Sequence, residues 1–233
     1  SSETIEALIE TAEQTNSHGY QSYTGIPELR NAISSWMAST YGVDFKAENE
    51  ILPLMGSKEG IMHISMAFLN PGDKVLVGEP GYPSYKNILK ALSLKPVLRQ
   101  TSFNNRYNLT REIIENTDAS GVLIASPANP TGQKLFKDEL QNLISAAQSK
   151  NMIFISDEIY HGLSYNEKDI CALQFDDDAL IINSFSKYFS MTGWRIGWMI
   201  VPEVNVRNIE RLAQNLYICP PSAGQYLALQ SLD

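Results

Sequence analysis

Residues 184–197 read SFSKYFSMTGWRIG and lie in the most apolar part of the chain. Between Asp178 and Glu203 the only charged residues are Lys187 and Arg195, and both are cations. A buried charge needs a partner of opposite sign, and no acidic residue lies near these two in sequence. The segment therefore predicts that the partner is an acid from a distant part of the chain or an anionic ligand.

Composition narrows the class of protein. The 233 residues carry a net charge of −8 and are 43% hydrophobic, which is enough to bury a sizeable core. An acidic chain without a basic run does not favour nucleic acid or an anionic membrane surface as a partner. The apolar stretch 179–202 contains two cations, an asparagine and two glycines, which argues against a transmembrane helix. We expect a cytoplasmic protein.

The cysteines and histidines give no sign of a metal site. Cys171 and Cys219 are far apart and have no CxxC spacing, so thiols in a reducing compartment are expected. His18, His63 and His161 show neither metal-ligand nor triad spacing. We expect no metal.

Short apolar runs alternate with amphipathic stretches from residue 51 onward. This alternation is typical of an α/β fold with a mainly parallel sheet, covered by helices on both faces in three layers. Thr110 is a predicted N-cap. The expected strands are 51–54, 74–80, 95–101, 121–126, 152–158, 179–185 and 195–201, and the expected helices are 56–70, 84–93, 111–117 and 137–150.

Polar motifs follow five of the expected strands. In parallel α/β sheets, ligands bind at the carboxyl ends of the strands. We therefore expect these five loops to form a single site. They are Gly56-Ser57-Lys58, Glu79-Pro80-Gly81-Tyr82, SPANPTG at 126–132, SDEIY at 156–160 and Ser184 to Lys187.

Lys187 and Asp157 each have an ordinary and a chemical interpretation. The stem of Lys187 can pack on neighbouring aromatic rings, or its amine can form a Schiff base with an aldehyde. Asp157 can cap the turn after its strand, or its carboxylate can pair with a protonated heterocyclic nitrogen. Tyr160 could donate a hydrogen bond into the same site.

The other polar residues divide in the same way. Asn129 is either part of a turn or an amide that bonds a ring hydroxyl, and Tyr82 is either core filler or a face that stacks on a flat ring. Arg195 suits bidentate binding of phosphate. A helix start and nearby hydroxyls also favour an anion, and these are supplied by Gly56, Ser57, Lys58, Ser184 and Ser186.

Taken in order, these motifs resemble the class I/II (fold-type I) aminotransferases, which depend on pyridoxal 5′-phosphate. The resemblance implies the large cofactor-binding domain of that fold over residues 1–233. It rests on segment 184–197 together with YQSYTGIPELR (20–30), GSKEGI (56–61), EPGYPSY (79–85), SPANPTG (126–132) and SDEIY (156–160).

The resemblance implies a role for each residue. Lys187 would hold the cofactor as a Schiff base while an amino group moves between an L-amino acid and a 2-oxo acid. Asp157 would keep the ring nitrogen protonated, and Tyr160 completes the implied catalytic set. The implied cofactor-binding set is Gly56, Ser57, Lys58, Tyr82, Asn129, Asp157, Tyr160, Ser184, Ser186, Lys187 and Arg195, with Tyr20 from a partner subunit.

Within that set, the resemblance implies that some residues bind the phosphate and others bind the ring. Asn129 and Tyr160 would bond the ring 3-hydroxyl, and Tyr82 would stack on the ring. Ser186 is expected to be a safer phosphate ligand than Ser184. Tyr20, preferred over Tyr23, implies a homodimer with shared sites. A cis peptide is expected at Asn129-Pro130.

The chain also departs from the family pattern. Relatives have an N-terminal arm, and a small C-terminal domain with the arginine that binds the substrate carboxylate. No residue here matches that arginine, so we expect the large domain alone, with poor transamination by itself. Two alternatives stay open: a pyridoxal-phosphate-dependent lyase of the same fold, which would give elimination products, and a non-catalytic homologue or fragment.

Overall fold

The computed structural model describes residues 2–165 and 167–232. They fall into two compact units, the first made of residues 1–60 and 184–233 and the second of residues 61–183. Helix α4 (Ser57–Phe68) and strand β6 (Leu180–Ser184) cross the boundary between them. In the described part of the chain, no helix combines the length and apolarity needed to cross a membrane.

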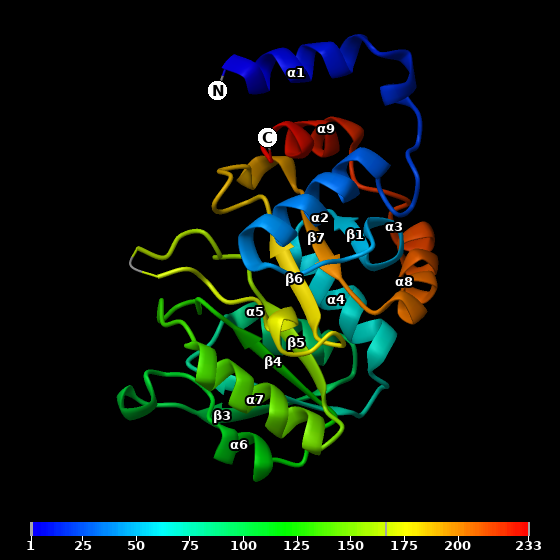
Figure 1. The fold of residues 1–233 in the computed structure, drawn as a ribbon. Coiled ribbons are helices and arrows are strands. Elements are labelled where there is room, and N and C mark those ends of the chain that lie inside the picture. Colours follow the sequence, from blue (N-terminus) through cyan, green and yellow to red (C-terminus); the bar gives the residue numbers. More distant parts are fainter. Residues whose placement is uncertain (1, 166, 233) are drawn as a thin grey trace. The chain divides into compact units, whose positions relative to one another are not determined.

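The second unit is built on parallel strands in the order β6-β5-β4-β2-β3 (Figure 1). The central strand β4 is buried at four consecutive positions, as expected for a parallel strand with both faces covered. The mainly parallel α/β sheet predicted from the sequence is therefore confirmed. The other strands of this unit are β2 (Lys74–Glu79), β3 (Lys95–Gln100), β4 (Gly121–Ala125) and β5 (Ile153–Asp157).

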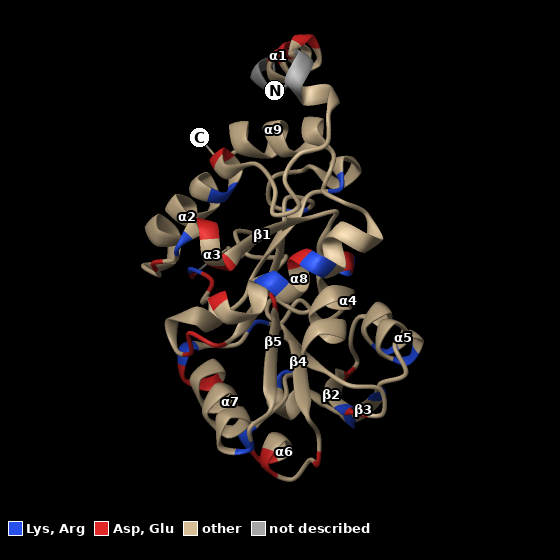
Figure 2. Cartoon of the chain, turned by 90° about the vertical axis from the view of Figure 1, so that its right-hand side faces the viewer, with Lys and Arg blue, Asp and Glu red and all other residues tan. Residues whose placement is uncertain are grey.

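Helices cover both faces of this parallel sheet. Figure 2 shows α7 on one side of β4 and β5 and α5 on the other. The predicted cap at Thr110 is confirmed, because its Oγ1 accepts a hydrogen bond of 3.4 Å from the Ile113 amide. The helices are α5 (Pro83–Ala91), α6 (Arg111–Glu115) and α7 (Lys137–Ser149), with short 3-10 turns η2 (Phe103–Asn105) and η3 (Ala172–Gln174).

The first unit contains an antiparallel strand pair, β1 (Ile51–Leu54) with β7 (Gly197–Ile200). Both strands were predicted from their apolar runs, but their direction was not. An apolar run sets burial, whereas direction depends on how distant segments pair. The remaining elements are α1 (Ser2–Glu13), η1 (Thr15–His18), α2 (Pro27–Tyr41), α3 (Ala47–Glu50), η4 (Thr192–Trp194), α8 (Glu203–Leu216) and α9 (Ser222–Gln230).

Arg30 ties α2 to the strand that leads into the candidate site. Its Nε donates to the Ile51 carbonyl at 3.0 Å, Nη1 donates to Thr24 Oγ1 at 3.1 Å, and Nη2 donates to the Glu48 carbonyl. The side chain is buried, with a residue exposure of 7%. One planar guanidinium therefore satisfies two backbone carbonyls and a hydroxyl at once, which an amine cannot reproduce.

We predict that Arg30→Lys lowers the free energy of unfolding by about 1–3 kcal/mol, because at least one buried carbonyl loses its donor. Urea denaturation measures the change. The matched control is Arg207→Lys, whose arginine is exposed on α8 and pairs with Glu210 at 2.6 Å; it should change stability by less than about 0.5 kcal/mol. Equal effects at the two positions would contradict the role given to Arg30.

Candidate active site

The register of the antiparallel pair in the first unit brings together two parts of the predicted site. Leu54, the last residue of β1, lies opposite Gly197, the first residue of β7. Because the strands are antiparallel, the residue two positions after Leu54 and the residue two positions before Gly197 lie side by side, which places Gly56 beside Arg195. Gly56 has a φ of +90°, and a Cβ built there would collide with the Arg195 guanidinium. Glycine at 56 therefore leaves the space that the guanidinium occupies.

Gly56 leads directly into α4, a helix of 12 residues. Ser57 at its first position is half-buried and Lys58 is exposed. The free amides of a first helical turn, together with the helix dipole, favour an anion. The structure thus groups Gly56, Ser57, Lys58 and Arg195 as the sequence predicts, at a place suited to a phosphate.

Lys187 and Arg195 are less buried than their apolar segment suggests. Arg195 is exposed and Lys187 is half-buried, so the expectation of two buried cations is wrong. Arg195 takes a left-handed conformation with φ +55°, and its Nη1 donates to the Thr192 carbonyl at 2.9 Å. The side chain thus lies between the Thr192 carbonyl and Gly56 and remains exposed.

The turn that carries Lys187 is held by backbone bonds and aromatic packing. The Phe185 amide donates to the Ile196 carbonyl at 3.1 Å, and the Ser190 amide donates to the Lys187 carbonyl at 3.0 Å. Phe185 is fully buried, and its ring centroid lies 4.9 Å from that of Trp198. The buried character of the segment therefore comes from its aromatic residues, which fix a turn that leaves Lys187 partly accessible.

The two serines of this turn have different surroundings. Ser184 is 2% exposed, and its Oγ donates to the Ile196 carbonyl at 3.2 Å while accepting from the Ser186 amide at 3.0 Å. Its hydroxyl thus already stabilises the backbone. Ser186 is half-buried, and its hydroxyl takes no part in those two bonds. This difference favours Ser186 over Ser184 as a phosphate ligand.

Tyr20 and Tyr23, both in the first unit, differ in exposure and in hydrogen bonding. Tyr20 is 83% exposed, whereas the Tyr23 hydroxyl accepts a hydrogen bond of 3.3 Å from Gln214 Nε2. Tyr23 therefore has a partner within its own unit. Tyr20 presents its ring to solvent, as a residue that reaches toward another molecule would.

In the second unit, three of the predicted loops leave the same edge of the parallel sheet. Val77 of β2 lies opposite Leu123 of β4, and Ala125 of β4 lies opposite Asp157 of β5. The carboxyl ends of these strands are therefore neighbours, as predicted for a ligand-binding edge. Tyr82, Asn129, Asp157 and Tyr160 lie at or just beyond those ends.

Asp157 is a buried carboxylate with its own hydrogen-bond donors. It is 2% exposed; its Oδ2 accepts from the Tyr85 hydroxyl at 2.6 Å and its Oδ1 from the Ile159 amide at 3.3 Å. Burial raises the pKa of Asp157 to about 6, although both hydrogen bonds act to lower it. Such a group favours a cationic partner, which would stabilise its ionised form.

Tyr85 is a site residue that the sequence analysis missed. Burial raises the pKa of its phenol well above 10, with the Asp157 charge adding to the effect, so the hydroxyl acts as a donor. Its ring centroid lies 5.4 Å from that of Tyr82, which is half-buried, in an edge-to-face arrangement. Tyr85 lies three residues after Tyr82, on the first turn of α5, and this spacing could have indicated that it belongs to the same site.

Asn129 and Tyr160 are in direct contact. Asn129 Nδ2 donates to the Tyr160 hydroxyl at 3.2 Å. The predicted cis peptide at Asn129-Pro130 is confirmed. Two polar side chains from different loops thus present a donor and a hydroxyl at one place, which suits recognition of a ring hydroxyl.

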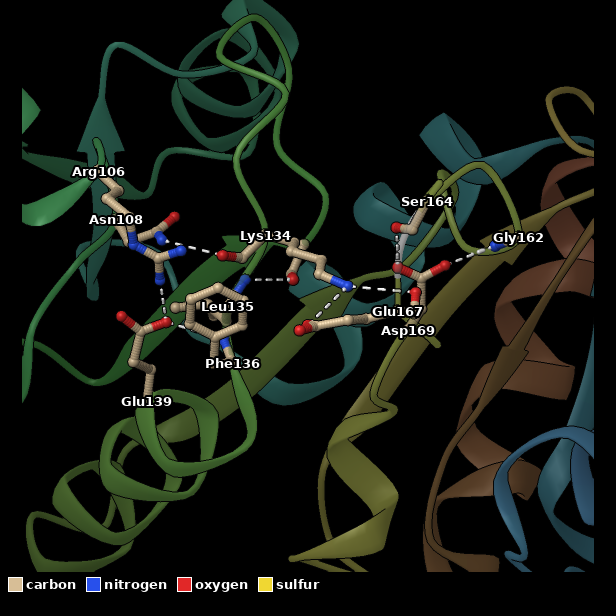
Figure 3. Close-up of polar contacts among 11 residues, drawn as sticks. Arg106, Asn108, Lys134, Leu135, Phe136, Glu139, Gly162, Ser164, Glu167 and Asp169 are labelled. Atoms are coloured by element: carbon tan, nitrogen blue, oxygen red, sulfur yellow. Dashed lines mark hydrogen bonds and ion pairs between the residues drawn. The ribbon is translucent and has the colours of Figure 1, made fainter.

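A cavity of about 700 Å³ includes Asn129 and Tyr160 in its wall. Figure 3 shows the polar contacts that hold the surrounding loops. Lys134 Nζ donates to the Glu167 carbonyl at 3.2 Å and lies 3.5 Å from its Oε2. Arg106 pairs with Glu139 and lies 4.1 Å over the Phe136 ring. Of the charged residues in this wall, Lys134 therefore pairs with Glu167, and Arg106 pairs with Glu139, which lies outside the wall.

Glu59, in the first unit, is a second residue beside the predicted site that the sequence did not indicate. Burial raises the pKa of its carboxyl to about 7, although the Met55 amide and the Tyr217 hydroxyl bond it. The Met55 amide donates to Glu59 Oε2 at 2.5 Å. This contact closes the turn that contains Gly56. Across the described residues, no group of three His, Cys, Asp or Glu side chains could hold a metal ion.

Comparison with known proteins identifies the family. The family model for aminotransferase class I and II matches residues 1–233. The chain belongs to this family. Members of the family use pyridoxal phosphate.

The relatives that match this chain are named for different amino acids. The chain is 37% identical to a valine–pyruvate aminotransferase of Mycobacterium tuberculosis and 34% identical to an aspartate aminotransferase of Sulfolobus acidocaldarius. These matches cover 98% and 99% of this chain and 60% of each relative. A crystal structure of an aminotransferase from M. tuberculosis matches with a TM-score of 0.94 and 37% identity, over 99% of this chain and 60% of that one. The chain thus spans about 60% of the length of these relatives.

Each unit, taken by itself, contains residues that fit one part of pyridoxal phosphate. The first unit offers a helix start and a guanidinium beside a glycine that makes room for it. The second offers a buried carboxylate and an amide–phenol pair. An acid suited to a pyridine nitrogen and donors suited to a phosphate and a ring hydroxyl are the chemistry that this cofactor requires.

We predict that Gly56→Ala weakens pyridoxal phosphate binding by at least tenfold, because a methyl group displaces the Arg195 guanidinium. Fluorescence titration gives the dissociation constant. Gly72→Ala is the matched control, since Gly72 has a similar φ of +95° and no atom within 4 Å of a built Cβ. Both variants carry backbone strain, but only Gly56→Ala should lose affinity; an equal loss in both would show that Arg195 is not involved.

The folded-state pKa of Asp157, about 6, lies above its ordinary value of 3.8, so folding favours the protonated acid. The stabilisation is complete below about pH 4 and is lost as the pH rises through 6. Relative to Asp157→Asn, the unliganded wild type should therefore lose up to about 3 kcal/mol of unfolding free energy between pH 4 and 7. Denaturation at several pH values tests this.

The control for this experiment is Asp177→Asn, which alters an exposed carboxylate of the same unit. The pH-dependent loss expected at Asp157 comes from burial of its carboxyl, so it should exceed any change seen with Asp177→Asn. A pH-independent difference for Asp157→Asn would mean that burial does not raise the pKa of Asp157.

Proposed function

We propose that the chain carries the cofactor-binding part of a pyridoxal-phosphate-dependent aminotransferase. In the reaction, an L-amino acid gives up its amino group and becomes a 2-oxo acid, and a second 2-oxo acid accepts that group. The observation that carries the proposal is the buried Asp157 carboxylate with its Tyr85 donor, at the strand edge where Asn129 and Tyr160 meet. Family membership supports the same reaction class.

The proposal assigns the phosphate to residues of the first unit. The Ser57 and Lys58 amides, the Ser186 hydroxyl and the Arg195 guanidinium would bind its oxygens, because amides at a helix start and a guanidinium are strong donors to phosphate. Gly56 gives Arg195 its space. Ser184 supports this set through the Ser186 amide.

Residues of the second unit are proposed to bind the ring. Asp157 would accept a hydrogen bond from the protonated ring nitrogen, and Tyr85 would hold the carboxylate in place through its 2.6 Å bond. Asn129 and Tyr160 would bond the ring hydroxyl, and Tyr82 would stack on the ring face. When bound, pyridoxal phosphate supplies an electron-accepting ring that stabilises negative charge at the substrate Cα.

Lys187 is proposed to carry the cofactor and to move protons. Its Nζ would attach to the cofactor aldehyde through a Schiff base, and once released by substrate it would take the proton from the substrate Cα. Its partial exposure on a turn fixed by Phe185 supports this role, since the amine can leave and return while its backbone stays in place.

The proposed assembly is a homodimer in the cytoplasm. The exposed ring of Tyr20 supports a contact with a partner subunit. Cys171 and Cys219 are both free thiols, as expected in a reducing compartment. Amino acids and 2-oxo acids are the proposed substrates, and the relatives named for valine and aspartate do not select one side chain.

Mixing the protein with pyridoxal phosphate should give a visible absorption band, and borohydride reduction should fix the adduct on Lys187. Mass spectrometry of peptides locates it. Lys187→Ala should abolish both the band and the adduct, because Lys187 is the amine proposed to attach to the cofactor aldehyde. Lys137→Ala, which alters an exposed lysine on α7, should change neither. Labelling spread over surface lysines in the wild type would contradict the assignment of Lys187 as the attachment residue.

A further inference from the structure

A buried carboxyl–imidazole pair follows the Asp157 strand and is not used by the proposed reaction. Glu158 and His161 have side-chain exposures of 1% each, and His161 Nδ1 lies 3.5 Å from Glu158 Oε2. Two ionisable side chains in the interior are costly to bury unless other groups bond them. The bonds that these two residues make with the surrounding segments show what they hold in place.

Glu158 connects three segments of the second unit, two through its carboxyl and one through its backbone. Its Oε1 accepts from the Ser156 hydroxyl at 3.0 Å and from the Ala172 amide at 2.9 Å. The Glu158 amide donates to the Ile182 carbonyl of β6 at 2.8 Å. One side chain thus joins the end of β5 to the start of η3, while its backbone continues the pairing with β6.

His161 closes the turn on itself. Its amide donates to the Glu158 carbonyl at 3.0 Å, so a backbone hydrogen bond and a side-chain contact of 3.5 Å join the same two residues. Tyr160 lies between them in sequence, and its hydroxyl accepts from Asn129 Nδ2. The direction of the Tyr160 ring therefore depends on a turn whose two ends are fixed by Glu158 and His161.

Strand geometry separates this pair from the Asp157 site. Side chains alternate between the faces of a strand, so Ser156 and Glu158 share one face of β5, and Asp157 points to the other. The 3.0 Å bond between Ser156 and Glu158 agrees with this, and Asp157 bonds Tyr85 instead. The pair can hold the turn without competing for the ring nitrogen.

We propose that Glu158 and His161 are positioning residues that hold the turn 157–162 so that Tyr160 presents its hydroxyl beside Asn129; the link to cofactor binding rests on the proposed function. Neither residue touches the cofactor in this scheme. Their effect reaches it through Tyr160, while Asp157 keeps its own anchors in the β4–β5 ladder and at Tyr85.

The first test needs no cofactor. Tyrosines are labelled with 3-fluorotyrosine, and the fluorine resonances of Tyr160 and Tyr85 are assigned from Tyr160→Phe and Tyr85→Phe. Glu158→Gln should shift or broaden the Tyr160 resonance more than that of Tyr85, whose partner Asp157 also feels the Glu158 charge. The matched control, Glu112→Gln, alters an exposed glutamate on α6 and should move neither. An unchanged Tyr160 resonance, or equal changes in both, would overturn the proposal.

A second variant covers the case in which Glu158→Gln does not fold. Ser156→Ala removes one donor to the carboxyl and keeps the pair, so a smaller change in the Tyr160 resonance is expected, again larger than any change at Tyr85. The double replacement Glu158→Gln/His161→Gln restores bonding between two amides. Partial return of the Tyr160 resonance toward its wild-type position would support the pairing itself, and no return would contradict it.

The second measurement is the dissociation constant of pyridoxal phosphate. Glu158→Gln should raise it about fivefold to tenfold, the effect of one hydrogen bond, and by the same factor as Tyr160→Phe. The double variant Glu158→Gln/Tyr160→Phe should bind pyridoxal phosphate no more weakly than either of its single variants, because both changes act through the same hydroxyl. Additive losses would contradict positioning. If the wild type does not bind the cofactor, the proposed function fails, and the fluorine result judges the turn by itself.

Discussion

The antiparallel register of β1 and β7 determines the arrangement of the first unit's candidate phosphate site. Leu54 and Gly197 face each other, and this places the glycine before α4 beside Arg195. The left-handed backbone at Gly56 then opens the space for the guanidinium. The aromatic packing of Phe185 and Trp198 fixes the segment between β6 and β7, so the turn with Lys187 starts from a rigid base. Charge contributes little to this framework.

Local patterns in the sequence predicted most elements of the fold. The apolar runs of β2, β4 and β5 and the cap at Thr110 lie where expected, because each depends on residues close in sequence. The loops at the ends of these three strands also meet as predicted, since parallel strands share one carboxyl edge.

What the sequence did not predict depends on strand pairing, on local backbone conformation and on contacts between distant residues. The direction of β1 and β7 is set by their pairing, and the exposure of Arg195 by a left-handed turn. Tyr85 bonds Asp157 across 72 positions of sequence. Glu158 meets Ala172 and His161 within a loop that has no strong pattern. The strand pairing, the Tyr85 bond and the Ala172 bond join residues far apart in sequence, whereas the Arg195 turn and the Glu158–His161 contact are local but have no clear sequence signal.

The alternation at the end of β5 also constrains how this strand can pair during folding. Asp157 and Glu158 are adjacent acids with different partners on opposite faces, a phenol on one side and a hydroxyl, an amide and an imidazole on the other. A slip of one residue against β4 or β6 would exchange the two faces. Tyr85 and the Ala172 amide lie on other segments, so each would lose its present acceptor, whereas Ser156 and His161 would move with the strand. The pair of acids thus penalises the wrong register twice, so chemical specificity at this strand end also serves the accuracy of strand pairing.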